Sequence, residues 1–203
     1  MIPVGVTQRI WQVREYPETR DALDVRWPAF LAACGALAVP LPNDPELAAR
    51  LARSLGLHGL VLTGGENLGA YGGDAAARDK TESALLDWSA AEGVPVLAVC
   101  RGMQFVLHAY GGRLEEVDGH VATEHQVEFT AGSARLVNSY HRWAAKSVPR
   151  PLIATGWAGD VVESVRHESL PLWGLMWHPE RVPGFAPEDI AEVTALFGSK
   201  GLT

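Results

Sequence analysis

The sequence contains few cysteines and no long hydrophobic run. Only Cys34 and Cys100 occur among its 203 residues, and a reducing cytoplasm, where a free thiol persists, is the simplest setting. No apolar stretch approaches the roughly 18 residues that a membrane span requires. No signal-peptide pattern opens the chain. We therefore expect a cytoplasmic protein that has no membrane as partner.

Basic residues are also in the minority. The chain has 17 Lys and Arg against 24 Asp and Glu, a net charge of −7 and a pI near 5.5. This balance argues against a general nucleic-acid binder, which shows a basic face, but it is compatible with one nucleotide held by a few arginines. Repeats, linkers and low-complexity tracts are missing too. The length predicts a single domain over residues 1–203.

Motifs for metals and phosphates are scarce. His120, Glu124 and His125 invite interpretation as a metal site, but no CxxC or HExxH motif accompanies them. The glycine-rich stretch 69–73 matches neither the P-loop nor the dinucleotide-binding pattern. We therefore expect no metal and no cofactor, and we place His125 in a pocket wall or in a bond to the backbone.

The first half of the chain alternates between strand and helix patterns. Strands are predicted at 4–8, 36–41, 59–63 and 94–99, and helices at 19–34, 45–55, 75–92 and after Cys100. Such alternation predicts a parallel sheet with helices on both faces. The second half is different, with short β-like segments at 113–117, 126–129, 135–137, 161–165 and 172–176 and one final helix at 187–197.

The most informative stretch is the strand that ends at Cys100. A helical pattern begins directly after it, and Gly102 is the residue type that a sharp strand-to-helix turn needs. This is the pattern of a nucleophile elbow with cysteine in place of serine, and the helix N-terminus favours a thiolate. A buried core cysteine, as we expect for Cys34, is the alternative.

Two other strand ends complete the chemistry of an acyl transfer. His178 can act as a base and Glu180 can orient it, which is the logic of a catalytic triad. The backbone amides of Gly65 and Arg101 can stabilise the oxyanion. Because ligands gather at the carboxyl ends of parallel strands, these groups are expected to meet. Taken singly, His178-Pro179-Glu180 is also compatible with a surface turn, and Gly64-Gly65 with a strand-terminating turn.

Three segments together resemble the class I glutamine amidotransferases. They are 100–104 (CRGMQ), 137–141 (VNSYH) and 174–180 (GLMWHPE). Within that superfamily, the segments 62–68 (LTGGENL) and 71–72 (YG) with Arg78, Asp79 and Glu82 are similar to the γ-glutamyl hydrolase branch, peptidase C26. The resemblance implies an α/β flavodoxin-like three-layer fold, with a mostly parallel central sheet and a smaller antiparallel β region in the second half.

The resemblance also implies roles for individual residues. Cys100, His178 and Glu180 are expected to form the catalytic triad, and Gly65 and Arg101 the oxyanion hole. Gln104 is expected to contact the glutamyl group, and Glu66 its ammonium. The segment Ser139, Tyr140 and His141 is expected to bind the α-amino and α-carboxylate ends of the substrate. Arg78 is expected either to contact a substrate phosphate or to solvate the start of its helix.

Two departures from the family pattern bear on the substrate. Ala98 stands where the elbow usually has glycine, and Arg142-Trp143 stand where γ-aminobutyrate-type relatives often have His-Gln. A cation and a flat ring suit a phosphate and a base. The segments 7–9, 15–16 and 20–27 are similar to hydrolases of γ-glutamyl-CDP-amidate, which serve the phosphoramidate modification of bacterial capsules.

The sequence therefore predicts a cysteine-dependent hydrolase that cleaves a γ-glutamyl amide through a thioester. The substrate expected from the resemblance is γ-glutamyl-CDP-amidate, giving cytidine diphosphoramidate and glutamate. One alternative is a hydrolase of γ-glutamyl amines, and another is a glutaminase subunit that passes ammonia to a synthetase partner. A non-catalytic binding module is a further alternative, and the intact Cys, His and Glu speak against it. The protein partners in view are a second copy of the chain and, under the glutaminase alternative, the synthetase.

Overall fold

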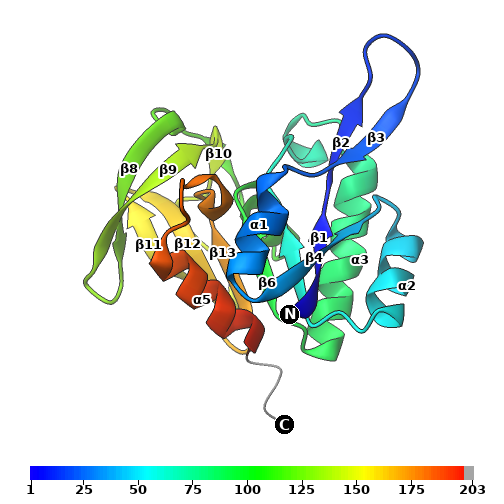
Figure 1. Cartoon of the computed structure of the whole chain (residues 1–203). Helices are drawn as coiled ribbons and strands as arrows, with labels where there is room; N and C mark the ends of the chain where they lie inside the picture. The colour runs from blue at the N-terminus through cyan, green and yellow to red at the C-terminus, as the bar shows by residue number, and fades with distance from the viewer. Residues whose placement is uncertain (199–203) are drawn as a thin grey trace.

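The structure, a computed structural model, describes residues 1–198 and is organised around one twisted sheet of nine strands (Figure 1). In spatial order these strands are β4 (Ala36–Leu41), β1 (Ile2–Thr7), β5 (Gly59–Leu62), β6 (Val96–Val99), β13 (Leu172–Leu175), β12 (Val161–His167), β11 (Leu152–Ala158), β8 (Val121–Phe129) and β9 (Ala134–Tyr140). The pairs from β4 to β13 are parallel, and those from β13 to β9 are antiparallel. The predicted antiparallel region therefore continues the same sheet.

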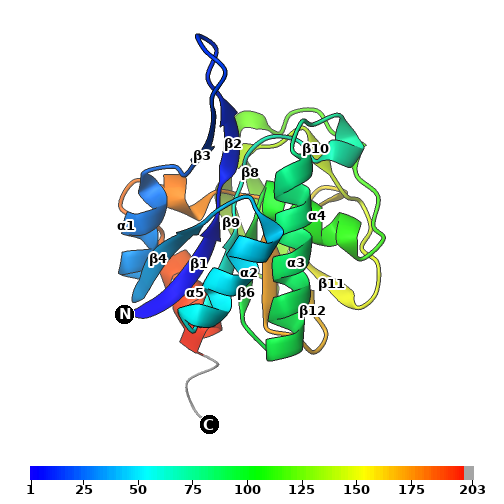
Figure 2. The same ribbon diagram turned by 90° about the vertical axis from the view of Figure 1, so that its right-hand side faces the viewer.

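Five α-helices and two short 3₁₀ turns connect the described strands. They are α1 (Arg26–Ala33), α2 (Pro45–Ser54), η1 (Gly69–Tyr71), α3 (Ala76–Glu92), α4 (Arg101–Ala109), η2 (Pro179–Arg181) and α5 (Pro187–Gly198). Figures 1 and 2 show α1 and α5 on one face of the sheet and α2, α3 and α4 on the other. The three-layer α/β fold expected from the sequence is thus present. None of the helices in residues 1–198 is long and apolar enough to cross a membrane.

The sheet separates two hydrophobic cores because the side chains of a strand alternate between its faces. Leu60, Leu62 and Ala98 point toward α2, α3 and α4. Val61 and Val99 point the other way, into the core that Trp27 and Phe30 of α1 and the apolar side of α5 complete. The central strands are covered on both faces, which is why they are continuous apolar runs in the sequence.

The predicted helix over 19–34 is wrong in its first half. Residues Thr19–Ala22 form β3, which pairs with β2 (Arg9–Gln12) in a hairpin that projects beyond the body (Figure 2). The four residues of β3 carry no large apolar side chain to bury, so helical packing against the sheet gains nothing there. The helix α1 begins at Arg26, and Pro28 lies in its first turn, where a missing N–H breaks no hydrogen bond.

Other predicted elements are confirmed. Asp44 caps α2 by accepting a hydrogen bond from the amide of Leu47, and Pro45 is the first helical residue. The helix α3 ends at Gly93, whose φ of +62° lies in the left-handed region that favours glycine. The short strand β7 (Glu115–Glu116) falls within the β-like segment predicted at 113–117, whereas β11 and the strand that pairs with β7, β10 (Trp143–Ala144), were not predicted.

Candidate active site

The turn at Cys100 joins β6 to α4 as an elbow. Its backbone has φ +51° and ψ −104°, a strained conformation for a residue with a side chain. The amide of Cys100 donates to the carbonyl of Leu175 on the neighbouring strand at 2.7 Å. This bond fixes the corner against the end of β13, three residues before His178.

Two glycines allow the chain to pack tightly around this corner. A Cβ at Gly102 would lie 2.1 Å from the carbonyl oxygen of Leu62, so only glycine lets α4 approach the end of β5. A Cβ at Gly64 would lie 2.5 Å from Cε1 of His178. The loop after β5 therefore packs directly on the imidazole ring.

Cys100, His178 and Glu180 come together as the sequence predicts. All three are nearly fully buried, and Nδ1 of His178 lies 2.7 Å from Oε1 of Glu180. The Cys100 side chain is the other group that acts on the charge of this ring. Burial alone would lower the pKa of His178, but Cys100 and Glu180 outweigh it and raise the pKa to about 9. The imidazole is therefore protonated at neutral pH.

Asn138, at the end of β9, holds the backbone of His178. The His178 amide donates to Oδ1 of Asn138 at 2.8 Å, and Nδ2 of Asn138 donates to the His178 carbonyl at 2.9 Å. The next aromatic residue on the strand, Tyr140, packs edge-on against the imidazole with centroids 5.7 Å apart. The guanidinium of Arg181 lies over the tyrosine ring, 4.8 Å from its centroid.

Two backbone amides near the elbow lack an acceptor in residues 1–198. Arg101 begins α4, so its N–H has no intrahelical partner. The Gly65 amide follows β5 and donates to no acceptor in the described chain. A Cβ at Gly65 would lie 2.4 Å from Nη1 of Arg78, which explains why a glycine stands there. Both amides are free to bind an oxyanion.

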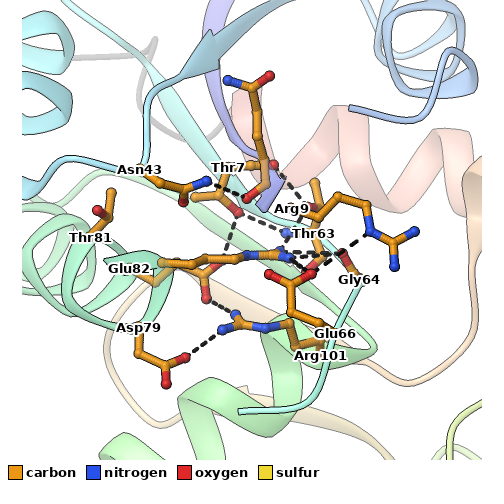
Figure 3. Close-up of polar contacts among 12 residues, drawn as sticks. Thr7, Arg9, Asn43, Thr63, Gly64, Glu66, Asp79, Thr81, Glu82 and Arg101 are labelled. Atoms are coloured by element: carbon orange, nitrogen blue, oxygen red, sulfur yellow. Dashed lines mark hydrogen bonds and ion pairs between the residues drawn. The ribbon is translucent and has the colours of Figure 1, made fainter. Parts of the chain in front are cut away.

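Buried charges hold the loop that carries Gly64 and Gly65. The carboxylate of Glu82 in α3 bonds Arg78 through Nε at 2.9 Å, Arg101 through Nη1, and the Thr7 hydroxyl at 2.8 Å (Figure 3). The second terminal nitrogen of Arg101 bonds Asp79. Burial would raise the pKa of Glu82, but the two guanidinium groups hold it below its ordinary value.

Arg78 takes neither of its two expected roles, contact with a substrate phosphate or solvation of the start of its helix. Its side chain is completely buried, and Nη2 donates to the Thr63 carbonyl at 2.6 Å and to its hydroxyl at 3.0 Å. Both terminal nitrogens also reach the Gly64 carbonyl at 3.3 Å. Nη1 of Arg78 lies 3.1 Å from Glu66, a residue also near Arg9 at 3.8 Å. Arg78 therefore shapes the loop from inside, and Glu66 already has two cationic neighbours.

Three expected substrate residues bond to the protein itself. Gln104 is nearly buried, and its amide donates to the Trp143 carbonyl at 2.7 Å. The buried Ser139 hydroxyl donates to the His120 carbonyl at 2.7 Å. His141 is buried with its Nε2 3.1 Å from Glu163. The geometry therefore favours Tyr140, which is 45% exposed, as the accessible member of the segment 139–141.

Arg142 and Trp143 lie at the start of β10. Arg142 is exposed, whereas the indole of Trp143 packs on Tyr71 with centroids 5.1 Å apart. A small hollow of about 30 Å³ opens beside His178 and Gly64, with Arg9 and Arg181 in its wall. A larger cavity of about 550 Å³ is lined by other residues, including Phe129 and Trp173, and by none of the triad. The smaller hollow is the candidate site, because His178 and Glu180 of the triad line it.

The sequence patterns did not indicate the contacts of Asn138, Glu82 and Glu163. Asn138 belongs to the segment that carries the resemblance, but nothing in the sequence of that segment indicates its contact with His178. Glu82 stands four residues after Arg78 on α3, which is a helical ion-pair spacing. Glu163 lies in the apolar strand β12 and gave no signal, because its histidine partners are distant in sequence.

Comparisons with known proteins agree with this arrangement. The family model for peptidase C26 matches residues 4–180. A Gamma-glutamyl-CDP-amidate hydrolase of Campylobacter jejuni is 28% identical over 185 residues, covering 89% of this chain and 91% of the relative. A glutamine-hydrolyzing GMP synthase subunit of Methanothrix thermoacetophila is 32% identical over 132 residues, covering 60% of this chain and 66% of the relative.

A solved structure shows the same fold. It is a Thermoplasma acidophilum protein provisionally designated a GMP synthase subunit, with a TM-score of 0.74 and 19% identity. The superposition covers 98% of this chain and 95% of that one. The family match covers most of the chain, and it supports an enzyme that hydrolyses amide bonds. The chain belongs to the peptidase C26 family, within the class I glutamine amidotransferase fold.

Proposed function

We propose that the chain hydrolyses a γ-glutamyl amide through a thioester on Cys100. The observation that carries this proposal is the buried arrangement of Cys100, His178 and Glu180 at the carboxyl ends of β6 and β13. A sulfur nucleophile, a base and a carboxylate that orients the base are what acyl transfer from an amide needs. The free amides of Gly65 and Arg101 supply the oxyanion hole.

A residue of the site can be assigned to each step of this hydrolysis. The sulfur of Cys100 attacks the γ-carbonyl carbon, and the charge that develops on oxygen is stabilised by the two amides. The C–N bond breaks as His178 gives its proton to the leaving nitrogen. Water attacks the thioester, His178 takes a proton from it, and glutamate leaves with the sulfur restored. Glu180 holds the imidazole in one orientation throughout.

For the leaving group we propose a nucleotide phosphoramidate, cytidine diphosphoramidate in γ-glutamyl-CDP-amidate. The Campylobacter jejuni relative, named for that substrate, aligns with 89% of this chain. Arg9 and Arg181 line the hollow beside His178, and Arg142 is exposed near the Trp143 carbonyl that Gln104 contacts. Arginines are suited to bind the diphosphate, because their planar guanidinium can donate two hydrogen bonds at once.

For the glutamyl half we propose the side chains of Gln104 and Tyr140. Gln104 lies one turn after the nucleophile and uses its amide nitrogen on Trp143, which leaves its carbonyl oxygen for the substrate ammonium. Tyr140 is half-exposed beside His178. Glu66, although paired with Arg78, is partly exposed at the same edge and can accept from the ammonium.

The test is a panel of γ-glutamyl compounds with glutamate release as the readout. The panel holds glutamine, γ-glutamyl amines and a γ-glutamyl nucleotide phosphoramidate. The proposal predicts the highest kcat/KM for the phosphoramidate and no release by Cys100→Ala, with Cys34→Ala as the matched cysteine control. Activity confined to γ-glutamyl amines contradicts the nucleotide half of the proposal, and full activity of Cys100→Ala contradicts all of it.

A second candidate is a glutaminase subunit that supplies ammonia to a synthetase. It is favoured by the Methanothrix GMP synthase relative and by an anthranilate synthase component 2 of Thermococcus kodakarensis, which is 34% identical over 99 residues. Under this candidate, glutaminase activity is low in the isolated chain and rises when a synthetase is added. Strong phosphoramidate hydrolysis without any partner excludes it. Either function places the thiol in a reducing cytoplasm, where Cys100 stays free.

A further inference from the structure

Three histidines and one glutamate meet away from Cys100. His125 belongs to β8 and Glu163 to β12, and His120 and His141 lie just beyond the paired ends of β8 and β9. Oε1 of Glu163 lies 3.1 Å from Nε2 of His141 and 3.3 Å from both Nδ1 of His120 and Nε2 of His125. We call these four residues the histidine cluster. The proposed hydrolysis uses none of them.

The histidine cluster is poorly satisfied as it stands. Glu163 and His141 are completely buried, and His120 and His125 expose only 12% and 15% of their side chains. Within residues 1–198, Oε2 of Glu163, Nδ1 of His141 and both ring nitrogens of His125 are buried without a hydrogen bond. Buried polar atoms are nearly always satisfied, so this set of atoms calls for a further group.

The distances between the nitrogen and oxygen atoms match a metal site. With zinc bonds of about 2.0–2.1 Å, the corners of a tetrahedral site are about 3.3 Å apart. Nδ1 of His120 lies 3.3 Å from Nε2 of His141, and the distances to Glu163 are alike. No two ligand atoms of His120, His125 and Glu163 are more than 4.8 Å apart, so the slightly exposed rings of His120 and His125 have to turn to bring their nitrogens to one ion.

We propose that the histidine cluster binds one divalent transition-metal ion of the zinc class. Imidazole nitrogens and a carboxylate oxygen are the ligand set that such ions take in proteins. Glu124, the acidic neighbour that the sequence suggested, is exposed on the other side of β8, because successive side chains of a strand alternate. Glu163 of β12 supplies the carboxylate instead, which is why the pattern in the sequence was too weak to predict a metal.

The ion has a structural task at the edge of the active site. It ties β8 and β9 to β12, and the segment between its ligands His120 and His141 includes Asn138 and Tyr140, which contact His178. The Ser139 hydroxyl already joins this segment to the His120 carbonyl. Metal binding therefore steadies the strand that positions the catalytic histidine, without contact with Cys100.

Cobalt is the probe that tests the site without any assay of hydrolysis. The purified full chain is treated with a chelator, dialysed and titrated with Co²⁺, and the visible absorption of the bound ion is recorded. We expect intense bands of tetrahedral Co²⁺ that saturate at about one ion per chain, disappear when Zn²⁺ is added, and accompany a rise in Tm. Absence of these bands in a folded sample overturns the proposal.

Variants locate the ion. His125→Asn and His120→Asn keep the partly exposed positions polar and should weaken Co²⁺ binding at least about tenfold. Glu163→Gln should do the same, and the two histidine variants stand in for it if the buried change prevents folding. The control is His58→Asn, because His58 is exposed and outside the cluster. Equal binding by the control and the cluster variants overturns the proposal.

Because the readout is metal binding, the result does not depend on the reaction at Cys100. A chain that binds Co²⁺ at the histidine cluster but fails to release glutamate from any γ-glutamyl compound supports the metal site and contradicts the proposed function. A chain that hydrolyses its substrate but shows no Co²⁺ binding that depends on the histidine cluster supports the proposed function and contradicts the metal site.

Discussion

The side-chain amide of Asn138 forms two hydrogen bonds with the backbone of His178, accepting from its amide at 2.8 Å and donating to its carbonyl at 2.9 Å. The two residues are 40 positions apart and lie on β9 and on the segment after β13. Together with the sheet, this paired contact sets where the imidazole lies relative to Cys100. It makes the antiparallel part of the sheet a support for the catalytic histidine.

Replacing Asn138 should therefore lower turnover more than binding. In Asn138→Ala both bonds are lost, and small shifts of a catalytic group cost about 10- to 100-fold in rate. We expect kcat to fall by that amount with KM little changed, and Asn138→Asp, which keeps only the acceptor, to fall between. The exposed Asn67→Ala serves as control. A wild-type kcat in Asn138→Ala contradicts the positioning role.

The pKa of His178 predicts how stability depends on pH. Its ordinary value near 6.5 is raised to about 9 in the folded chain, mainly by Cys100 and Glu180 against the opposing effect of burial. Between these values the His178 imidazole therefore keeps its proton in the folded state and loses it in the unfolded state. This contribution to the free energy of unfolding is fully present below about pH 6.5 and is lost as the pH rises through about 9.

Urea unfolding of two variants between pH 6 and 9 tests whether Cys100 causes this pH dependence of stability. Cys100→Ala removes the largest raising influence on the His178 pKa, so its free energy of unfolding should fall less steeply with pH than that of the wild type. Burial raises the pKa of Cys34 to about 12, outside this range. Cys34→Ala should keep the wild-type slope, and equal slopes for all three proteins would falsify the coupling.

Glu82 is the position where charge removal should cost most. Its carboxylate is buried between Arg78 and Arg101, and breaking a buried pair by removing one partner destabilises proteins by about 3–5 kcal/mol. We expect Glu82→Gln to lose stability of that order in chemical denaturation, while Glu92→Gln, exposed at the end of the same helix, changes it by less than about 0.5 kcal/mol. Similar losses in the two variants contradict the network.

A substitution at Gly64 tests how closely the reaction rate depends on the position of the His178 ring. A methyl group there meets the His178 ring at 2.5 Å and has to displace it. We expect Gly64→Ala to lose about 100-fold in kcat. Gly198→Ala, where an added Cβ meets nothing within 4 Å, should behave as wild type. Unchanged kcat in Gly64→Ala contradicts the contact between this loop and the imidazole.

Much of the parallel half of the sheet could be predicted from the sequence, because neighbouring residues specify each of its elements. The apolar run that ends at Cys100, the cap at Asp44 and the glycine after α3 each specify an element from neighbouring residues alone. The hairpin of β2 and β3 could not be predicted, because its strands have only four residues each, are largely exposed, and are fixed at their base by contacts distant in sequence. One of these joins Asn43 to Asp21 at 2.7 Å.

The same distinction between local and distant interactions applies to the residues of the candidate site. Cys100, His178 and Glu180 follow strand ends, and parallel strands bring such ends to one edge, so their meeting is a property of the topology. The role of Arg78 was mispredicted because it depends on whether the side chain is buried. That burial follows from the packing of α3 against the end of β5 and the start of α4, which the local sequence does not show. The same holds for His141, whose partner Glu163 comes from a strand that lies later in the chain.

The central claim is that Cys100 carries the γ-glutamyl group during the reaction. Peptide mass spectrometry of enzyme quenched with acid during turnover of the γ-glutamyl phosphoramidate tests it most directly. We predict the mass of one γ-glutamyl group on the peptide that contains Cys100, none on the peptide that contains Cys34, and no adduct in Cys100→Ala. Release of glutamate at the wild-type rate by Cys100→Ala, without any adduct, would contradict the account.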